Sequence, residues 1–508
     1  MNSNPQTTAH SLLVSGLKEE QKNNPIKAIE LYTLAINIDP KNEEAVRRIS
    51  NIFIAHKEHR KAIEPLKYLS TIAKKAHIAH FNLAACYTAL GEQLNAENNY
   101  LQAIKREPNF WIAYALYTDI LIRQKRLDAA ENFLNEAREK HGVQGELEWA
   151  IAKVMVNKEL IEKAIPLFEK AIDLGIQKEF NAKMLSDYAF ALEKVKNYAK
   201  SFEYHCKAQA LFKRSNSHLP KNTSFHDITI SKSLKYVKRE ECKNWTTEKL
   251  DNHLDPIFII GFPRSGTTLC EQVLHSHSHL ITTDELEVIK EKSVSISEIL
   301  GRHMNHIRDW SKLTEHDIIT WRASYFDEMA KRIRNYSPKL RIVDKLPIQI
   351  VHLATIRRFF PNSPIIMMKR DPRDSCLSNF FQTFEHNEMT NNFYDIKSTF
   401  KYYARVMKCY KHLKTELDLN LLEVKYEEMC DDFESHARTI INHIGEPWED
   451  NVLEYYKEKN ARFVSTPSYS AITNTVNKNA VGKWCHYRDN IQSHVSIIKP
   501  FIKDFGYE

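Results

Sequence analysis

A pattern of one small residue, a large residue four positions later and a second small residue after three more recurs through the first two hundred residues. Its copies begin at residues 28, 62, 96, 130 and 164, a constant spacing of 34, and a looser copy begins at residue 201. The copies are Ala28, Tyr32 and Ala35; the weaker Ala62 and Leu66; Ala96, Tyr100 and Ala103; Ala130, Leu134 and Ala137; Ala164, Phe168 and Ala171; and Ser201, His205 and Ala208. This periodicity predicts stacked helix pairs, because each unit buries its apolar face only against its neighbours.

The period and the small residues at helix-crossing points resemble the tetratricopeptide repeat. Pro40 and Pro108 follow two of the predicted second helices, as the proline of that repeat does. The resemblance implies a helical solenoid whose concave face holds a peptide or a protein partner. As alternatives, the array only braces the neighbouring domain or forms a homodimer. We predict the array over residues 1–212, a polar linker or connecting helix over 213–254 and a second domain over 255–508.

Short β-rich runs alternate with longer helical stretches in this second domain. The expected strands are "IFIIG" from residue 257, "LRIVDK" from 340, "IIMMKR" from 365 and "LLEVKY" from 421. Apolar strands separated by helices indicate a parallel sheet covered on both faces, so the fold class is an α solenoid followed by a P-loop-like α/β domain. Ligands bind beyond the carboxyl ends of such strands. The residues that follow them are therefore expected to converge: residues 263–268, Lys345, Arg370 and Tyr426.

The loop after the first expected strand, "GFPRSGTT", has the features of an anion site. Gly261 and Gly266 have Walker A spacing, but Thr267 stands where an NTP-binding loop has lysine. Backbone N–H groups, the start of the following helix, the Arg264 guanidinium and the hydroxyls of Thr267 and Thr268 all favour a phosphate group. The missing lysine and the lack of a second acidic strand for Mg²⁺ disfavour an ATP- or GTP-hydrolysing enzyme.

A second anion site is predicted after the strand that begins at residue 365. Arg370 ends that strand, and "DPRDSCLSNFF" predicts a helix with Asp371 as N-cap and Asp374 as its capping partner. Ser378 lies about two helical turns beyond Arg370. An arginine and a serine so placed suit a phosphate monoester on another edge of the same nucleotide. The alternative is an arginine paired with local carboxylates.

Together, "PRSGTTL" and "RDPRDSCLS" resemble the sulfotransferases, which use 3′-phosphoadenosine-5′-phosphosulfate (PAPS) as sulfuryl donor. The resemblance is strongest to protein-tyrosine sulfotransferases and to bacterial tetratricopeptide-sulfotransferase proteins, over about residues 255–490. It assigns the 5′-phosphosulfate to Arg264, Ser265, Gly266, Thr267 and Thr268. It assigns the 3′-phosphate to Arg370 and Ser378, and further nucleotide contacts to Tyr426, Ser468 and Lys483. One departure is Gln382, where tyrosine sulfotransferases have another phosphate-binding arginine.

The same resemblance assigns catalytic roles. Glu285 in "TTDELEVI" matches the general base, Lys345 in "VDKLP" matches the transition-state lysine, and Arg264 and Ser468 supply charge and a hydroxyl donor. An acceptor hydroxyl must lose a proton, so a nearby carboxylate helps, and the adjacent Asp284 competes with Glu285 for this role. The implied reaction is sulfuryl transfer to a hydroxyl, most specifically of a protein tyrosine. A small phenol or sugar acceptor and a non-catalytic nucleotide-binding scaffold are the alternatives.

Composition limits the other classes of function. The net charge of +7 over 508 residues is too diffuse to predict nucleic-acid binding. No apolar run approaches the roughly 18 residues of a membrane span, and no signal peptide is evident. Eight scattered cysteines indicate reduced thiols, so we expect a cytoplasmic protein. The histidines of "HSHSHL" are expected to mark a helix end and a turn rather than a zinc site, because no accompanying ligand pattern exists, and no metal is expected.

Overall fold

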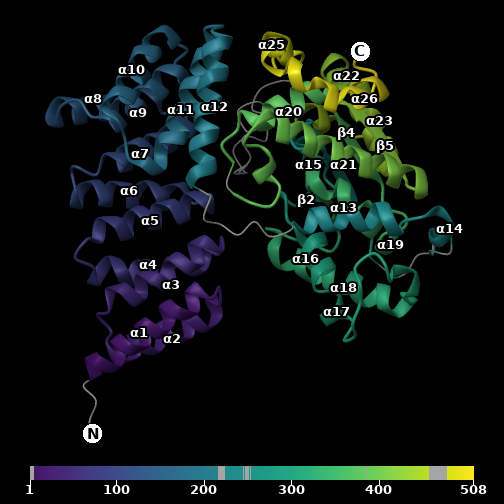
Figure 1. Cartoon of the computed structure of the whole chain (residues 1–508), viewed down its shortest axis with the longest axis horizontal. Coiled ribbons are helices and arrows are strands. Elements are labelled where there is room, and N and C mark those ends of the chain that lie inside the picture. Colours follow the sequence, from purple (N-terminus) through teal and green to yellow (C-terminus); the bar gives the residue numbers. More distant parts are fainter. Residues whose placement is uncertain are drawn as a thin grey trace. The chain divides into compact units, whose positions relative to one another are not determined.

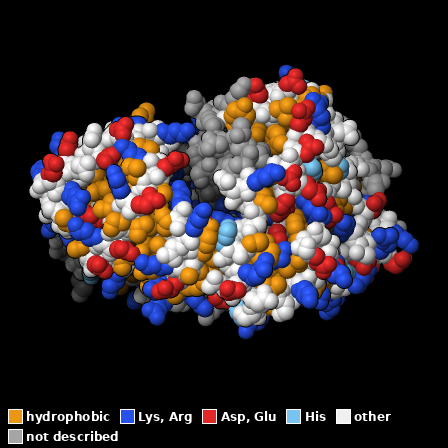
Figure 2. All heavy atoms as spheres, turned by 90° about the horizontal axis from the view of Figure 1, so that it is seen from above, with side chains coloured by type: hydrophobic (Ala, Val, Ile, Leu, Met, Phe, Trp, Pro, Cys, Tyr) orange, Lys and Arg blue, Asp and Glu red, His pale blue; other side chains and the backbone are white. Residues whose placement is uncertain are grey.

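The structure is a computed structural model that describes residues 5–215, 224–243, 245, 251, 253–384, 386–456 and 478–508. The chain divides into two compact units, Met1–Asn197 and Tyr198–Glu508 (Figure 1). Among the described residues, no helix has both the length and the apolar content required to cross a bilayer. Figure 2 shows Lys and Arg side chains interspersed with Asp and Glu side chains over the visible face, which fits the expected diffuse charge.

The first unit consists of helices that pack as consecutive pairs. Its helices are α1 Pro5–Gln21, α2 Pro25–Ile38, α3 Glu43–Ala55, α4 His59–Ile72, α5 Ala76–Ala89, α6 Gln93–Arg106, α7 Trp111–Arg123, α8 Leu127–His141, α9 Gly145–Asn157, α10 Ile161–Leu174 and α11 Lys178–Lys194. Each helix packs against the next along the chain, as α1 does against α2, α3 against α4 and α5 against α6. This arrangement confirms the predicted helical solenoid.

The repeated small and large residues lie on the second helix of each pair and are buried. Ala28, Tyr32 and Ala35 of α2 have no exposed surface, and the sets on α4, α6, α8 and α10 are buried in the same way. Pro40 and Pro108 follow the ends of α2 and α6, as the pattern predicts. The 34-residue period therefore reports helix packing directly, because a larger residue at the alanine positions would separate the helices.

Polar contacts also join successive repeats. Asp119 of α7 and Lys153 of α9 occupy the same position in consecutive repeats, and their side chains are 2.5 Å apart. Lys183 of α11 reaches the other carboxylate oxygen of Asp119 at 2.8 Å. Trp149 of α9 donates a hydrogen bond of 2.9 Å to Asp187 of α11. Since Lys153 is nearly buried, its pairing with Asp119 supplies the compensation that a buried charge requires.

The helix α12, Tyr198–Ser215, belongs to the second unit, whereas the predicted repeat array continues to residue 212. Its buried side chains explain the difference. The Gln209 amide donates a hydrogen bond of 2.6 Å to the carbonyl of Phe380, and the ring of His205 stacks on Phe381 with centroids 4.1 Å apart. The looser last copy of the pattern therefore packs against the second unit rather than against a following repeat.

Within the described residues, the second unit holds one parallel sheet with the strand order β2-β3-β1-β4-β5. The strands are β1 Ile257–Gly261, β2 Leu280–Thr282, β3 Arg341–Lys345, β4 Ile365–Lys369 and β5 Leu421–Lys425. The four predicted strands are confirmed together with their parallel direction. The short strand β2 was not predicted, because three residues carry no periodicity that separates a strand from a turn.

The helices of the second unit after α12 are α13 Phe225–Tyr236, α14 Arg239–Cys242, α15 Thr267–His275, α16 Val288–Val294, α17 Ile296–Ile299, α18 Glu315–Arg332, α19 Leu353–Phe359, α20 Pro372–Phe380, α21 Ile396–Glu416, α22 Tyr426–Asp431, α23 Phe433–Ile444, α25 Arg488–Ile491 and α26 Lys499–Asp504. Short 3₁₀ segments are η1 Trp310–Lys312, η2 Pro347–His352, η3 Thr390–Asn392, η4 Asp450–Glu454, η5 Lys483–Tyr487 and η6 Gln492–Ile497. Helices thus separate most of the strands along the chain, as a doubly covered parallel sheet requires.

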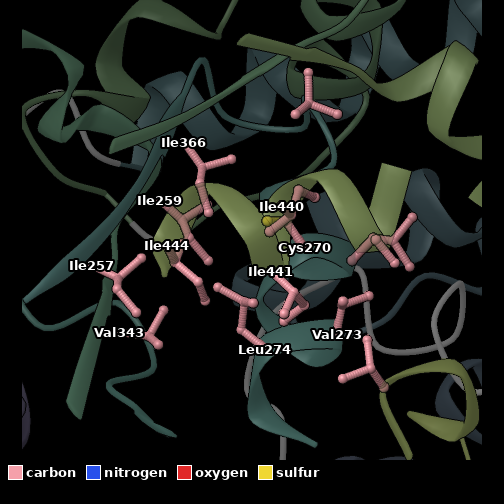
Figure 3. Packing of buried hydrophobic residues seen from close by; sticks show 14 of the residues in the cluster. Ile257, Ile259, Cys270, Val273, Leu274, Val343, Ile366, Ile440, Ile441 and Ile444 are labelled. Atoms are coloured by element: carbon pink, nitrogen blue, oxygen red, sulfur yellow. The ribbon is translucent and has the colours of Figure 1, made fainter. Parts of the chain in front are cut away.

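Helices cover both faces of this sheet. On one face, Ile257 and Ile259 of β1 pack with Cys270 and Leu274 of α15 and with Ile441 of α23 (Figure 3). On the other face, Phe258 of β1 contacts Phe360, with ring centroids 5.6 Å apart, at the end of α19. The carboxyl ends of the strands meet at one edge of the sheet, and the candidate site is built there.

Candidate active site

The loop between β1 and α15 approaches its neighbours closely. A Cβ atom on Gly261 would lie 2.5 Å from the Ser265 hydroxyl and 2.8 Å from the carbonyl of Met368, so only glycine fits. The backbone of Arg264 is in the left-handed region, at a φ of 68°. The Ser265 hydroxyl is buried and has no hydrogen-bond partner among the described residues. The loop therefore holds a buried hydroxyl donor at the start of α15, where N–H groups also favour an anion.

Gly266 is the second glycine that the loop requires. Its φ is 97°, and a Cβ atom there would lie 2.5 Å from Cδ2 of Tyr426. The ring of Tyr426, at the start of α22, therefore lies directly over the loop. Thr267 and Thr268 follow in the first turn of α15 and are buried. The structure thus brings the loop and Tyr426 together, as the strand-end rule predicts.

We expect Gly266→Ala to destabilise the second unit by more than backbone strain alone. A left-handed conformation costs an ordinary residue about 1–2 kcal/mol, and overpacking against Tyr426 adds about 1–3 kcal/mol. Gly445→Ala is the matched control, because its φ of 77° is similar but no atom lies within 4 Å of the added methyl group. Calorimetric unfolding measures both variants. Equal losses of stability would show that Tyr426 does not pack on the loop.

Two arginines and a serine connect this loop to the end of β4. Arg264 Nε donates a hydrogen bond of 3.1 Å to the Ser378 hydroxyl of α20. Arg370 donates a hydrogen bond of 2.9 Å to the carbonyl of Arg264, and its guanidinium lies 5.2 Å from the centre of the Tyr426 ring. Burial, reinforced by the charge of Arg370, lowers the pKa of Arg264 to about 10. The Arg264 guanidinium therefore stays charged at neutral pH, and the structure brings Arg264, Arg370 and Ser378 together as the strand-end rule predicts.

Asp374 has a different role from the predicted one. Asp371 caps α20 by accepting a hydrogen bond from the N–H of Arg373, as predicted, but Asp374 is not its capping partner. The Asp374 carboxylate instead accepts hydrogen bonds of 2.7 Å from the N–H groups of both Gly482 and Trp484. Burial raises the pKa of Asp374 to about 6, although Arg370 opposes that rise.

These contacts fix the chain on both sides of Lys483. Arg370 also donates a hydrogen bond to the carbonyl of Ala480, so two residues of the β4–α20 segment hold the 480–484 segment. Lys483 is therefore carried by a segment that α20 anchors near Arg370. Ser468, the other nucleotide and catalytic residue assigned in this segment, lies outside the described residues. The Gln382 carbonyl accepts a hydrogen bond of 2.7 Å from Gln209 of α12, which places Gln382 at the end of α20 beside α12.

Glu285 and Lys345 form an ion pair at the edge of the sheet. Lys345 Nζ lies 2.7 Å from Glu285 Oε1, with the lysine side chain fully buried and the glutamate side chain 36% exposed. The N–H of Glu285 donates to the carbonyl of Lys345 at 3.1 Å, and the N–H of Lys345 donates to the Thr283 hydroxyl at 3.2 Å. Backbone and side-chain contacts therefore clamp the 283–285 segment to the end of β3.

The backbone of this segment is strained. Asp284 and Glu285 have φ values of 54° and 61°, which are uncommon for consecutive residues other than glycine. Strain of this kind persists only where surrounding contacts enforce it, and it clusters at functional sites. The negative charge of Glu285 also acts on Arg264 and opposes the lowering of its pKa, so the ion pair lies within electrostatic reach of the arginine cluster.

A third charged residue at this site was not predicted. Glu271 of α15 is fully buried, and its Oε2 atom lies 3.0 Å from Lys345 Nζ. Its other oxygen accepts a hydrogen bond of 3.4 Å from the N–H of Asp284. From the sequence alone, Glu271 is one polar residue of the helix that follows the loop. Only the unusual burial of a carboxylate, which the fold reveals, distinguishes it from a solvated charge.

The three histidines after α15 have separate partners. His275 ends α15 and contacts the Thr282 hydroxyl, His277 contacts the carbonyl of Pro447, and His279 contacts Glu446. The helix end and turn expected from "HSHSHL" are confirmed. Within the described part of the chain, no group of His, Cys, Asp and Glu residues has an arrangement that holds a metal ion.

Comparisons with known proteins agree with this fold. Residues 256–450 match the model of the sulfotransferase family, and residues 78–110 match that of the tetratricopeptide repeat. The chain therefore combines a tetratricopeptide repeat with a sulfotransferase-family domain, as the sequence resemblance implied. The matched family region runs from the start of β1 to beyond α23 and includes Arg264, Glu285, Lys345 and Arg370.

The similar proteins include enzymes of known name. Protein-tyrosine sulfotransferase A of Caenorhabditis elegans is 24% identical over 50% of this chain and 67% of its own length. Protein-tyrosine sulfotransferase 1 of Danio rerio is 25% identical over 50% of this chain and 72% of its own length. An uncharacterized protein of Aquifex aeolicus is 29% identical over 61% of this chain, and the match spans only 40% of that protein.

Proposed function

We propose that the protein transfers a sulfuryl group from PAPS to a hydroxyl acceptor, most specifically the phenol of a protein tyrosine. The observation that carries this proposal is the Glu285–Lys345 ion pair within electrostatic reach of Arg264, which in turn contacts Ser378 and Arg370. Sulfuryl transfer to a hydroxyl requires a base and positively charged groups. The carboxyl edge of this parallel sheet supplies them as one carboxylate, one lysine and two arginines. The likeness to tyrosine sulfotransferases supports the choice of acceptor.

The residues at the sheet edge fit an adenosine bisphosphate. The Ser265 hydroxyl and the Nε atom of Arg370 are buried donors without a hydrogen-bond partner among the described residues. Buried donors require acceptors, and phosphate and sulfate oxygens supply them. Arg264, Ser265 and the first turn of α15 would hold the 5′-phosphosulfate, and Arg370 with Ser378 would hold the 3′-phosphate. Tyr426 and Lys483 would contact the nucleotide.

In this mechanism the protein side chains stabilise the negative charge that develops during the transfer and accept the proton of the acceptor hydroxyl. When bound, PAPS supplies the sulfuryl group, whose S–O bond to the phosphate is exchanged for an S–O bond to the acceptor oxygen. Glu285 accepts the proton of the acceptor hydroxyl at a carboxylate oxygen. Arg264 and Lys345 stabilise the negative charge that develops at the site, and such preorganised charge is usually the largest contribution to catalysis. No protein nucleophile is needed.

We also propose that the repeat array holds the polypeptide that carries the acceptor, and that the protein acts in the cytoplasm. Helical repeats commonly offer extended binding surfaces for peptides. A small phenol or a sugar hydroxyl is the alternative acceptor, and a homodimer formed through the repeats is the alternative use of the array. Deleting residues 1–197 would distinguish these alternatives only if the second unit were first shown to fold alone. The experiments therefore use the full chain.

Incubation of the full chain with ³⁵S-labelled PAPS tests the activity. The acceptors are tyrosine peptides, small phenols and sugars, and we expect label to enter the tyrosine peptides. Ligand binding is measured in parallel, since a ligand at 100 times its Kd stabilises a protein by about 2.7 kcal/mol. Adenosine 3′,5′-bisphosphate is expected to raise the melting temperature at low concentration, whereas ATP is not.

Each outcome has a defined meaning. Label only in phenols or sugars would replace the tyrosine by a small acceptor. Binding of adenosine 3′,5′-bisphosphate without transfer to any acceptor would favour a nucleotide-binding scaffold. Stronger stabilisation by ATP than by adenosine 3′,5′-bisphosphate would contradict the assignment of the nucleotide site itself.

A further inference from the structure

The carboxylate–lysine cluster, made up of Glu271, Lys345 and Glu285, places one cation between two anions. Lys345 Nζ is 2.7 Å from Glu285 and 3.0 Å from Glu271. The two carboxylates differ in their surroundings, because the Glu271 side chain is 1% exposed and that of Glu285 is 36% exposed. Glu285 therefore faces solvent and any acceptor, whereas Glu271 is sealed inside the domain.

Burial alone lowers the pKa of Lys345, since it penalises the charged ammonium group. The charges of Glu271 and Glu285 outweigh this effect and hold the pKa of Lys345 above its usual range. The two carboxylates together thus keep the lysine cationic in a buried place. Glu271 also accepts the N–H of Asp284, so the same carboxylate contacts both the lysine and the strained segment that carries Glu285.

We propose that Glu271 is a positioning residue, which shares the charge of Lys345 so that Glu285 stays basic enough to accept the acceptor proton. This inference rests on the proposed sulfuryl transfer. In a variant without the Glu271 charge, Lys345 no longer pairs with two carboxylates. Its full charge then acts on Glu285 and favours the charged form of the Glu285 carboxylate more strongly. A carboxylate so stabilised is a weaker base.

Charge balance during the proton transfer supports the same role. The resting carboxylate–lysine cluster carries a net charge of −1, from two carboxylates and one ammonium. When the hydroxyl proton moves to a Glu285 oxygen, that carboxylate becomes neutral and leaves the acceptor oxygen with the negative charge. Lys345 then still has Glu271 as counter-ion within the domain. Without Glu271, the buried ammonium would lose the remaining carboxylate that contacts it among the described residues, which a low-dielectric interior disfavours.

The charged groups that surround Glu285 come from three elements and its own segment. They are Lys345 at the end of β3, Glu271 on α15, Arg264 in the loop before α15, and the neighbouring Asp284 and Glu287. Glu271→Gln removes one negative charge and changes none of the others. Glutamine has the same shape and keeps an oxygen for the N–H of Asp284.

The test is the pH dependence of kcat/KM in the full chain with PAPS and the best acceptor found for the wild type. Glu271→Gln is expected to move the acidic limb of the profile about one pH unit lower, because the base holds its charge to lower pH. We expect kcat at pH 7 to fall by up to about tenfold, because a base whose pKa is one unit lower accepts a proton at most about ten times more slowly. Glu271→Asp, which keeps the charge on a shorter side chain, is expected to retain the wild-type acidic limb and to lose less activity.

A second readout does not need turnover. In ligand-free protein with ¹³C-labelled glutamate carboxyl groups, the NMR titration midpoint of Glu285 is expected to fall in Glu271→Gln, with Glu285→Gln used for assignment. The affinity for adenosine 3′,5′-bisphosphate, measured by calorimetry, is expected to stay within about twofold of the wild type, since the phosphate-binding groups are intact.

The outcomes separate this inference from the proposed function. An inactive wild-type chain would overturn sulfuryl transfer, whatever the NMR titration shows. An active wild type with an unchanged acidic limb and an unchanged Glu285 midpoint in Glu271→Gln would overturn the role of Glu271 alone. If Glu271→Gln fails to fold, Glu271→Asp decides the matter: an acidic limb shifted to lower pH despite the retained charge, or a kcat equal to that of the wild type, would contradict the proposal, and a reduced kcat with an unchanged limb would support it.

Discussion

Glu285→Gln is expected to lower kcat by about 10²–10⁴-fold, the range that a general base contributes to proton transfer. Glutamine keeps the oxygen that contacts Lys345, so the 283–285 segment should retain its conformation. The affinity for adenosine 3′,5′-bisphosphate should be unchanged or higher, because the variant removes a negative charge near Arg264. Steady-state kinetics and calorimetric titration measure the two quantities separately, and a loss confined to kcat identifies a group that acts on the proton.

Two other variants serve as comparisons for Glu285→Gln. Glu291→Gln on α16 is the surface control, because that carboxylate is exposed and paired only with Arg332 among the contacts shown by the structure. Asp284→Asn tests the neighbouring carboxylate that competes for the role of base. A larger loss of kcat in Asp284→Asn than in Glu285→Gln would assign the base to Asp284 and contradict the proposed mechanism.

Much of the fold was predictable because its signals are local. The repeat period follows from alanines that must be small where helices cross, and all of these positions are buried in the structure. Four strands were predicted because each is a short run rich in apolar residues that alternates with longer helical stretches. The strand β2, Leu280–Thr282, was missed because its pairing with β3 is a tertiary contact that its own sequence does not encode.

The site was predictable to the extent that topology determines it. Residues at the carboxyl ends of neighbouring parallel strands must meet, so Arg264, Lys345, Arg370 and Tyr426 could be grouped before the structure was seen. Contacts that join distant segments could not be predicted in this way. Asp374 has the spacing of a capping residue, yet it holds the backbone around Lys483, more than a hundred residues away in sequence.

The burial of Glu271 is a second feature that the sequence could not predict. In the sequence Glu271 resembles a solvent-exposed polar residue of a helix, and its burial beside Lys345 is visible only in the fold. A buried carboxylate that contacts a lysine is informative because such groups are costly unless they are paired. The proposed catalytic centre thus contains a residue that motif matching alone would not select.

The largest expected effect on the free energy of unfolding comes from breaking the Glu271–Lys345 ion pair. Lys345→Met is expected to reduce the free energy of unfolding of the second unit by about 3–5 kcal/mol, because it removes the ammonium group that lies 3.0 Å from the buried Glu271 carboxylate. Methionine fills a similar volume with an apolar side chain, so the loss reports charge rather than a cavity. Turnover should also disappear, since the variant lacks the cation beside the base. Differential scanning calorimetry measures the unfolding transition of the second unit separately from that of the repeat array.

The double variant Lys345→Met with Glu271→Gln separates the two consequences. Removing the Glu271 charge as well leaves neither member of this pair as a buried ion, so the stability is expected to return most of the way to that of the wild type, by an interaction energy of about 2–3 kcal/mol. Turnover should remain absent, because the catalytic cation is still missing. If the double variant is as unstable as Lys345→Met alone, the charge of the Glu271 carboxylate does not cause the loss, and Glu271 and Lys345 are not coupled as their 3.0 Å contact implies.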